Sequence, residues 1–410
     1  MSGSPEDRKR GRQDDTNVCC SKRVCNPRSG VANPLGTQNS DRLRLEDRTA
    51  WTPVVCLLFL FALLVFSVQL KSPTTDEQNH IARGLAYLRT GDLRLSQEHP
   101  PGVNVWSAWP LLLDPNVRLP LESQSWANAE WYGLSDQLLW RTPDTGRLND
   151  AGPSAGERAQ RIVFATRVPV MWLTLITAAL VYRWARALGG PWAGLAALGL
   201  TALDPTLLAH GRLTTTDVGL TCTALAAMYA LWRALSAPQT GRGLRGQRAR
   251  WGPWIAAGVA LGAALLAKFS ALVLIPVVAI AALVACLRRG PTSSGRRCSA
   301  GPRLLGVIVL VASAALVVWA GYAFTWGPIA ALHGMSGPAP AFWTGIASIL
   351  RRTGAGSPAF LLGQISTQGW WYYFFVAFAV KTPLPAILLL GIGGLGIGPV
   401  APEFPSFLIP

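Results

Sequence analysis

The sequence predicts an all-α integral membrane protein, a polytopic helical bundle of about eight spans with a large external loop after the first helix. Half of the 410 residues are hydrophobic and only 14% are charged, and the mean hydropathy is +0.30. This composition is typical of chains that cross a membrane several times. The basic residues are also concentrated in particular loops, which is the charge asymmetry of a multi-pass membrane protein.

The net charge of +16 is large enough for a nucleic-acid-binding protein, but its distribution argues for membrane topology instead. No Asp or Glu occurs between Asp217 and Glu403, and the arginines fall between apolar segments. We therefore expect membrane lipids, and no nucleic acid, as partners. The seven cysteines are scattered. Their irregular spacing favours reduced thiols over a metal cluster.

The N-terminal part of the chain divides into three segments. Residues 1–50 are polar, with ten Lys/Arg and seven Asp/Glu, and are expected to form a disordered basic tail in the cytoplasm. Residues 51–70 are apolar and long enough to span, and they start too late in the chain for a secretory signal peptide. Residues 71–161 are rich in Pro, Trp and acids, and their short apolar pieces are expected to lie along the membrane interface.

Residues 162–398 are expected to form the transmembrane bundle. Its spans are predicted at 162–182, 191–208, 218–235, 253–267, 271–287, 304–324 and 372–397. The loops rich in Arg and free of acids should be cytoplasmic. Two such loops flank 253–287, so this stretch should cross twice, as two short helices that meet near Lys268. The N-terminus then lies inside, and 71–161, 204–217 and 325–371 lie outside.

An adjacent pair of acids, Asp76 and Glu77, follows the first span. Thr74 and Glu77 fit the capping-box pattern, and on that interpretation the acids only complement a helix N-terminus. The alternative is that Asp76 is a catalytic base at the membrane surface. The two interpretations are compatible, because Glu77 alone completes the box. Glu77 itself is then a cap, a partner of the base or a direct participant.

Two further stretches place polar groups where an apolar helix would not need them. The first is "EHPPG", with Glu98 and His99, and the second is the outer turn "LDPTLLAHGRLTTTDVGL", with His210, Arg212 and Asp217. Simpler interpretations stay open for several of these residues. His99 can rigidify a Pro-Pro turn, Asp217 can cap the following helix, and His210 and Arg212 can anchor the chain at the interface.

Three cations lie at predicted membrane depth: Arg167, Lys268 and Lys381. A charge in this position costs about 2.5–3.5 kcal/mol on insertion scales, so each needs a partner, a water-filled cavity or a ligand. Arg167 can also snorkel to the interface, and the tight turn already accounts for a charge at Lys268.

The order of these motifs resembles a known superfamily. "TTDEQNHIARGLAYLRTGDLRLSQEHPPG", "ATRVPVMW", "TALDPTLLAHGRLTTTDVGL", "LGAALLAKFSALVLIP" and "WWYYFFVAFAVKTPLP" are similar to segments of the GT-C polyprenyl-phosphate-dependent glycosyltransferases. The chain resembles bacterial relatives of the protein O-mannosyltransferases and the lipid A aminoarabinose transferases. The similarity covers about residues 50–390.

This resemblance implies an inverting transfer of a mannose-like hexose or a pentose. The donor is a polyprenyl-phosphate sugar, and the acceptor is a hydroxyl on protein, lipid or glycan at the outer face of the inner or plasma membrane. The family's acidic pair maps to Asp76, the implied base, and Glu77. The family's His-Pro-Pro maps to His99 and the two prolines, although Gly102 follows where a Leu is usual. The acid of the outer turn maps to Asp217.

The chemistry also needs positive charge for the departing phosphate and a carboxylate for the acceptor proton, both at the lipid–water boundary. Asp76 and Glu77 are the predicted catalytic residues. The predicted substrate-binding residues are Glu98, His99, Arg167, His210, Arg212, Asp217, Lys268 and Lys381. No cofactor is assigned. A divalent metal held by Asp76 and Asp217 stays an open alternative, although the sequence shows no ligand set.

Two other classes of function stay open. A transporter or lipid flippase would account for the spans and the buried cations, although we find no internal repeat. An inactive membrane scaffold is the second, because residues 399–410 end abruptly where the relatives usually continue, so we expect a truncation relative to the family. The sequence does not identify the sugar, the acceptor or the length of the lipid.

Overall fold

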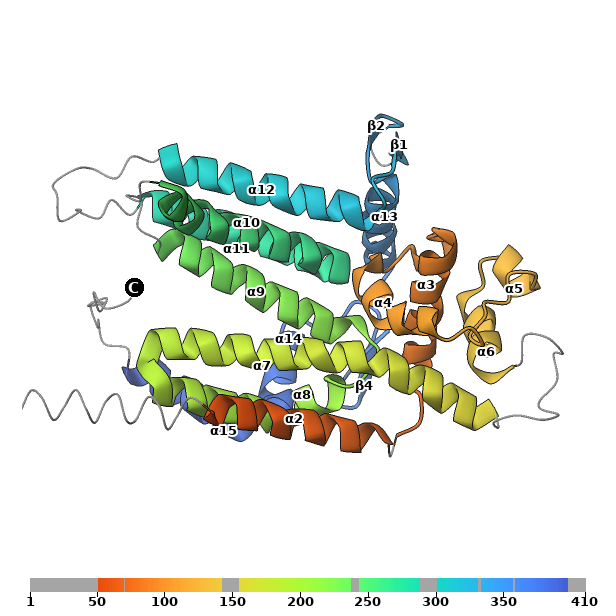
Figure 1. The fold of residues 1–410 in the computed structure, drawn as a ribbon, viewed down its shortest axis with the longest axis horizontal. Coiled ribbons are helices and arrows are strands. Elements are labelled where there is room, and N and C mark those ends of the chain that lie inside the picture. The colour runs from red at the N-terminus through yellow and green to blue at the C-terminus, as the bar shows by residue number, and fades with distance from the viewer. Residues whose placement is uncertain are drawn as a thin grey trace, which may run out of the picture. The chain divides into compact units, whose positions relative to one another are not determined.

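The computed structural model describes residues 51–396, apart from residue 70 and the segments 142–154, 237–242, 288–300, 331–332 and 357. The predicted tails at 1–50 and 399–410 lie outside the described residues. The described part consists of α-helices with two short β-hairpins (Figure 1). Several of the helices are long and apolar, so the prediction of a helical polytopic membrane protein is confirmed.

Every predicted span is mainly helical, although the one at 191–208 is interrupted at Leu203 and Asp204 and the one at 372–397 at Thr382 and Pro383. The helices concerned are α2 (Thr52–Gln69), α7 (Ala155–Ala202), α9 (Thr216–Ser236), α10 (Gly243–Ala267), α11 (Leu274–Leu287), α12 (Gly301–Gly321), α14 (Tyr373–Lys381) and α15 (Leu384–Gly396).

The number of spans recognised in the structure is smaller than the predicted eight. Among the described helices, five are long and apolar enough to cross a membrane, or six if α14 and α15, bent by 111°, count as one span. The difference has two causes. The single helix α7 contains two predicted spans, and α11 has 14 residues, fewer than the roughly 20 of a straight crossing.

The long helix α7 is two helices joined at Gly190. Its 48 residues would extend about 72 Å if straight, more than twice the hydrocarbon thickness of a bilayer. Gly190 instead has φ 83° and ψ −177°, a conformation that favours glycine, and the chain turns back there (Figure 1). Met171 of the first half and Leu198 of the second share one buried cluster with Leu60 and Leu64 of α2.

The rest of the bundle is built on α10, which packs against both α9 and α12. The three helices share a buried apolar cluster, which includes Leu231 of α9, Trp254 and Leu261 of α10, and Leu310 and Ala314 of α12. At its C-terminal end α10 stops at Ala267, and Lys268 is extended, with φ −159° and ψ 140°. The 3₁₀ helix η3 (Phe269–Val273) and then α11 follow. The predicted break near Lys268 is confirmed.

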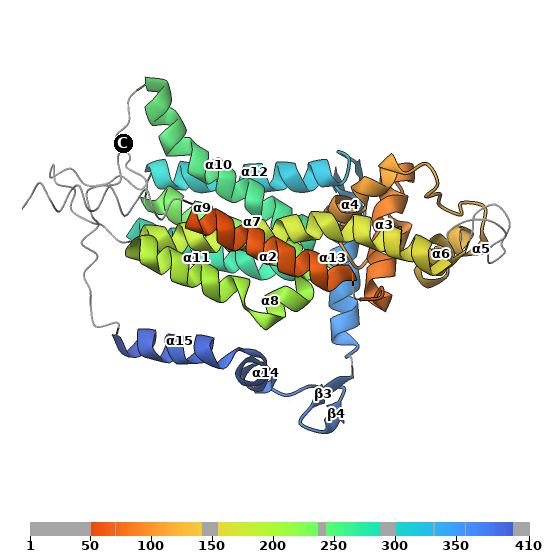
Figure 2. The ribbon, with the colours of Figure 1, turned by 60° about the horizontal axis from the view of Figure 1, so that its bottom comes forward.

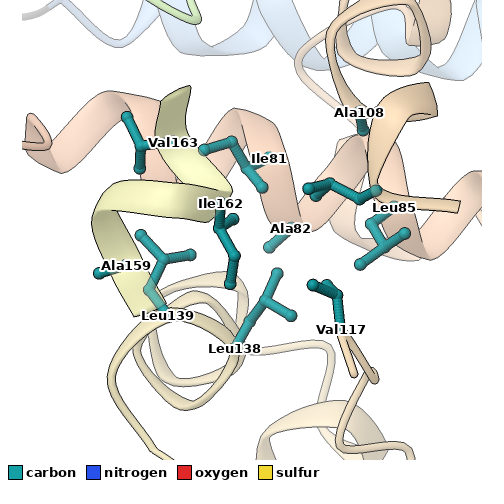
Figure 3. Packing of buried hydrophobic residues seen from close by; sticks show 11 residues of the cluster. Ile81, Ala82, Leu85, Ala108, Val117, Leu138, Leu139, Ala159, Ile162 and Val163 are labelled. Atoms are coloured by element: carbon teal, nitrogen blue, oxygen red, sulfur yellow. The ribbon is translucent and has the colours of Figure 1, made fainter. Parts of the chain in front are cut away.

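The segment between the first two spans folds into short helices. They are α3 (Thr75–Thr90), η1 (Arg94–Ser96), α4 (Pro101–Ala108), η2 (Trp109–Leu113), α5 (Gln124–Ala127) and α6 (Trp131–Trp140). Figure 3 shows Ile81 and Leu85 of α3 packed against Leu138 of α6 and Ile162 of α7. This apolar contact ties the segment to the first turns of α7.

Helices α3 and α4 cross at very short distance because Gly84 has no side chain. A Cβ added to Gly84 would lie 2.0 Å from the backbone oxygen of Asn104 and 2.8 Å from the Cβ of Ala108. The close approach aligns the N-terminal half of α3, which carries His80, with the residues that precede and begin α4.

A second connecting segment follows α12. It contains the hairpin β1 (Trp326–Pro328) and β2 (Ser336–Pro338), the helix α13 (Pro340–Gly354), and the hairpin β3 (Ala359–Leu361) and β4 (Gln364–Ser366). Helix α13 packs on η3, because Phe342 contacts Phe269 with ring centroids 5.6 Å apart. Figure 2 shows α13 on the same side of the bundle as α3 and α4.

A short helix, α8 (Pro205–His210), lies between the second half of α7 and α9. Asp204 caps it, with Oδ1 accepting a hydrogen bond from the backbone N–H of Leu207 at 2.7 Å. Asp217 is not a cap. It lies inside the first turn of α9, so the simpler interpretation of this residue is not supported.

Candidate active site

The candidate site is assembled from five chain segments that meet at one end of the bundle. Its residues are Asp76, His80 and Arg83 of α3, Glu98 and His99 before α4, Asp217 of α9, Lys268 at the end of α10, and Arg352 of α13. They are linked by hydrogen bonds, ion pairs and electrostatic interactions of the described side chains.

The first turn of α3 separates the two adjacent acids. The predicted capping box is present: the Thr74 side chain accepts from the N–H of Glu77 at 3.4 Å, and Glu77 accepts from the N–H of Thr74 at 2.9 Å. Asp76 is exposed and, within the described part of the chain, makes no hydrogen bond or ion pair. Its carboxylate is stabilised by the helix N-terminus and remains open to a ligand.

Glu77 has the opposite environment, because its side chain is fully buried against Arg167. Arg167 Nε lies 2.7 Å from Glu77 Oε1, and Arg167 Nη2 lies 2.6 Å from Glu77 Oε2. The backbone N–H of Thr214 donates to Oε1 at 2.9 Å. Burial disfavours the charged carboxylate, but the bonds and charge of Arg167 outweigh it and hold the pKa of Glu77 below its ordinary value.

Arg167 is fully engaged in the same network. Besides Glu77, its guanidinium donates to the carbonyl oxygens of Lys71 and Ser72, both at 3.1 Å. Arg167 was predicted to bind substrate and Glu77 to act in catalysis. The structure joins them to each other, and a buried arginine is stabilised by a carboxylate partner. The pair connects α3, α7 and the turn that carries Thr214.

Two imidazoles form the centre of the site. His80 Nδ1 lies 2.9 Å from Asn104 Oδ1. Asn104 Nδ2 donates to Ser96, so Oδ1 is left to accept from His80. The ring of His99 meets His80 edge to face, with centroids 5.1 Å apart. Burial lowers the pKa of His80, and burial lowers the pKa of His99 to about 3 with help from the nearby His80 and cations. Both rings are therefore neutral near pH 7.

Two ion pairs border the histidines. Lys268 Nζ lies 2.6 Å from Asp217 Oδ1, and Arg352 pairs with Glu98. The side chains are partly exposed, at 35% for Lys268 and 63% for Arg352. Such pairs contribute about 0–1 kcal/mol, so a more strongly charged anion could replace either carboxylate at little cost.

A cavity of about 230 Å³ opens beside these charges. One end is lined by Glu98, His99 and Lys268. The rest is mainly apolar and is lined by Phe269, Leu272, Ile346, Ile349 and Leu350. A space with the ammonium group of Lys268 at one end and apolar side chains beyond suits an amphiphile with an anionic head.

Sequence reasoning missed two cations of the site, Arg83 and Arg352. Arg83 is buried, with its guanidinium 4.5 Å from the centroid of the Trp131 ring. Burial lowers its pKa, while Glu98 and Asp76 act in the opposite direction. A signal for Arg83 existed: Asp76, His80 and Arg83 recur at intervals of four and three residues on one face of a helix. Arg352 had no such signal, because α13 reaches the site only through tertiary packing.

Three predicted residues do not join this constellation. Arg212 donates to the carbonyl oxygen of Ser67 at 2.8 Å, at the end of α2. His210 is exposed at the end of α8, and Lys381 is exposed at the end of α14. In the described part of the chain, no hydrogen bond, ion pair or ring contact connects them to the residues of the site. They lie on elements that the sequence could not position in space.

The described residues contain no group of three or more His, Cys, Asp or Glu that could hold a metal ion. Of the two carboxylates considered for a divalent metal, Asp217 is paired with Lys268, and Asp76 makes no hydrogen bond or ion pair with another described residue.

Residues 160–319 match the family model of the dolichyl-phosphate-mannose-protein mannosyltransferases. The resemblance to polyprenyl-phosphate-dependent glycosyltransferases is thereby confirmed. The matched region runs from α7 to α12 and includes Arg167, Asp217 and Lys268, whereas Asp76 and His99 lie before it. Comparisons with curated proteins and with solved structures gave no match. The family implies a membrane glycosyltransferase that uses a polyprenyl-phosphate-linked sugar.

Proposed function

Starting from the match of residues 160–319 to the dolichyl-phosphate-mannose-protein mannosyltransferases, we propose a specific reaction for this membrane protein. It moves a mannose-like hexose or a pentose from polyprenyl phosphate to an acceptor hydroxyl on protein, lipid or glycan. The reaction is an inverting displacement at the outer face of the inner or plasma membrane, with the N-terminus in the cytoplasm.

The contrast between Asp76 and Glu77 supports this proposal most directly. Glu77 is bound on both oxygens by Arg167 and two backbone N–H groups, and it cannot take a proton without breaking a buried ion pair. Asp76 is exposed and unpaired in the described part of the chain. It also lies close enough to His80 to act on it electrostatically, as Asp217 does. Asp76 is the carboxylate that can act as base.

The bond changes follow from this placement. The acceptor oxygen attacks the anomeric carbon and loses its proton to Asp76, while the bond from that carbon to the phosphate oxygen breaks. The electron pair stays on polyprenyl phosphate, whose charge rises in the transition state and is stabilised by nearby cations. Lys268 lines the cavity, and Arg352 is paired with Glu98, which also lines it. The phosphate would displace Asp217 from Lys268 and Glu98 from Arg352.

The neutral histidines have a different role in this proposal. A ring with a pKa of about 3, as His99 has, offers hydrogen bonds without charge near pH 7. It can therefore orient sugar hydroxyls without competing for the phosphate. Arg167 keeps its role as the partner of Glu77, which holds the first turn of α3 in place.

The proposal is tested by release of polyprenyl phosphate from a labelled lipid-linked sugar by purified protein. Donors with different sugars are compared, with and without a hydroxyl acceptor. Release that depends on the acceptor supports glycosyl transfer. Movement of intact donor across a vesicle membrane without cleavage would indicate a flippase, and neither activity would indicate a scaffold.

The two cations give a sharper form of the test. Lys268→Met and Arg352→Met should each weaken donor binding while the protein stays folded, because both side chains are partly exposed. The matched control is Arg141→Met. Arg141 is an exposed cation at the end of α6 that is paired with Asp136 of the same helix, away from the cavity. If the donor affinity is unchanged in both site variants, the donor phosphate does not bind at Lys268 and Arg352.

A further inference from the structure

A second and larger cavity lies outside the candidate site. Its volume is about 710 Å³, and it lies between the end of α2 and the beginning of α7. Lys71, Arg161, Val68 and Phe164 are among the residues that line it, together with Glu157 and Arg167. It shares no lining residue with the cavity beside His99.

The cavity lies at a membrane–water boundary, whichever face of the membrane that is. Val68 is in the last turn of the apolar helix α2. Phe164, 40% exposed, is in the first apolar turn of α7, which begins at Ile162 directly after Arg161. Lys71 and Arg161 lie just beyond these apolar ends, on the polar side of both helices. The lining therefore changes from apolar to cationic in the direction in which a lipid changes from acyl chain to headgroup.

The charges of the lining favour an anion. Arg167 is neutralised by Glu77 through two hydrogen bonds at 2.6 and 2.7 Å. Lys71 and Arg161 have no hydrogen-bonded or ion-paired carboxylate in the described part of the chain. Glu157 contributes one negative charge, so Lys71, Arg161 and Glu157 together leave a net charge of about +1 in the lining.

We propose that this cavity binds the headgroup of an anionic membrane phospholipid. The phosphate contacts Lys71 and Arg161, and the glycerol and upper acyl carbons lie against Val68 and Phe164. A bound lipid would join α2 to α7 at the linker whose carbonyls at Lys71 and Ser72 accept hydrogen bonds from Arg167. Because Arg167 also holds Glu77, the lipid would stabilise the first turn of α3, which carries Asp76.

Native mass spectrometry tests this with detergent-purified full-length protein, titrated with phosphatidylglycerol or phosphatidylcholine in the absence of any sugar donor. We expect phosphatidylglycerol adducts at lower lipid concentration than phosphatidylcholine adducts. Lys71→Gln and Arg161→Gln should each weaken phosphatidylglycerol binding by about fivefold, the effect of one basic residue at a lipid surface. Arg233→Gln, an exposed cation in the last turn of α9, is the matched control and should bind as wild type.

Several results would overturn the proposal. Equal binding of the two phospholipids, or the same loss in Arg233→Gln as in the cavity variants, would show that no specific headgroup site exists. Competition by inorganic phosphate at equal concentration would indicate a site for a free anion. Stronger binding of polyprenyl phosphate, abolished by Lys71→Gln, would assign the cavity to the donor. Since none of these readouts involves sugar transfer, the outcome is independent of the proposed reaction.

Discussion

At the scale of single residues, Asp76 and Glu77 show how neighbours in sequence acquire different chemistry. Both lie in the first turn of α3, yet successive helical residues point about 100° apart. Glu77 faces the bundle and meets Arg167, whereas Asp76 faces the solvent near His80. The capping box could be read from the sequence. The partner Arg167, ninety residues later, could not be assigned from local pattern.

Asp76→Asn is the direct test of the base. Asparagine has nearly the same size and cannot take the proton, so transfer should fall by about a hundred- to ten-thousand-fold. The thermal unfolding midpoint should barely move, because the carboxylate has no partner to lose among the described residues. Transfer and unfolding are measured on the same preparation. Asp204→Asn, at the cap of α8, is the control and should keep full activity. If Asp76→Asn retains more than about a tenth of wild-type transfer, the base lies elsewhere.

Glu77→Gln should behave in the opposite way. It leaves the Arg167 guanidinium buried beside a neutral amide, and breaking a buried pair in this manner costs about 3–5 kcal/mol. We expect a large drop in the unfolding midpoint, seen by size exclusion after heating. The double variant Glu77→Gln with Arg167→Met removes the stranded charge and should recover part of the loss. A Glu77→Gln protein with the wild-type midpoint and no transfer would instead restore the predicted catalytic role of Glu77.

His99 predicts how stability depends on pH. Its pKa is about 3 in the folded protein, against an ordinary value of 6.5. Between these two pH values the imidazole is protonated in the unfolded chain and neutral in the folded protein. Stability is then complete above pH 6.5 and falls as the pH is lowered toward 3. Burial also lowers the pKa of His80, which therefore adds to the same loss of stability at low pH. Glu77, whose pKa is held below its ordinary value of 4.5 mainly by Arg167, adds to the loss of stability only below about pH 4.5.

The measurement is the unfolding midpoint between pH 7.5 and 5. Wild-type protein should lose stability over this range, and His99→Gln should lose distinctly less, because it has no proton to take up. His210→Gln changes an exposed histidine and should keep the wild-type slope. Equal slopes for wild type and His99→Gln would mean that the ring is protonated in the folded protein at pH 5.

At the scale of elements, local sequence patterns predicted where helices form, but they did not predict which helices pack against each other. The capping box of α3 follows from a short-range rule and is present. The break at Lys268, inferred from the charges of the loops that flank 253–287, is present as well. The position of α13 follows from Phe342 packing on Phe269, seventy-three residues apart. No local pattern reports such a contact. Arg352 was missed for this reason.

Gly84 is the element-scale prediction. Gly84→Ala places a Cβ within 2.0 Å of the Asn104 carbonyl oxygen, so α3 and α4 must separate. Forced overpacking costs about 1–3 kcal/mol, and the separation should also disturb the bond between His80 and Asn104. We expect a lower unfolding midpoint and reduced transfer. Gly252→Ala in α10 meets no atom within 4 Å and should be neutral or slightly stabilising. A neutral Gly84→Ala would show that the crossing is looser than the structure indicates.

At the scale of the whole molecule, hydrophobicity predicted where helices form but not how each crosses. All eight predicted segments are mainly helical, yet α7 merges most of two of them around Gly190, and α14 and α15 divide one by a bend of 111°. Apolar length is a local property, whereas a turn within an apolar stretch depends on what packs beside it. The direction of crossing rests on a different signal, the confinement of acid-free Arg clusters to alternate loops.

That signal predicts that the N-terminus is cytoplasmic and the α3–α6 segment is external. In a variant with all seven cysteines replaced, Glu122→Cys and Arg233→Cys each introduce one thiol at an exposed position, next to α5 and in the last turn of α9. A membrane-impermeant maleimide added to intact cells should label the Glu122→Cys protein at once, and the Arg233→Cys protein only after permeabilisation. The two variants control for each other, because they share expression and background. The reverse pattern would invert the topology and place Asp76, His99 and Lys268 on the cytoplasmic side, where a donor exposed on the outer face could not reach them.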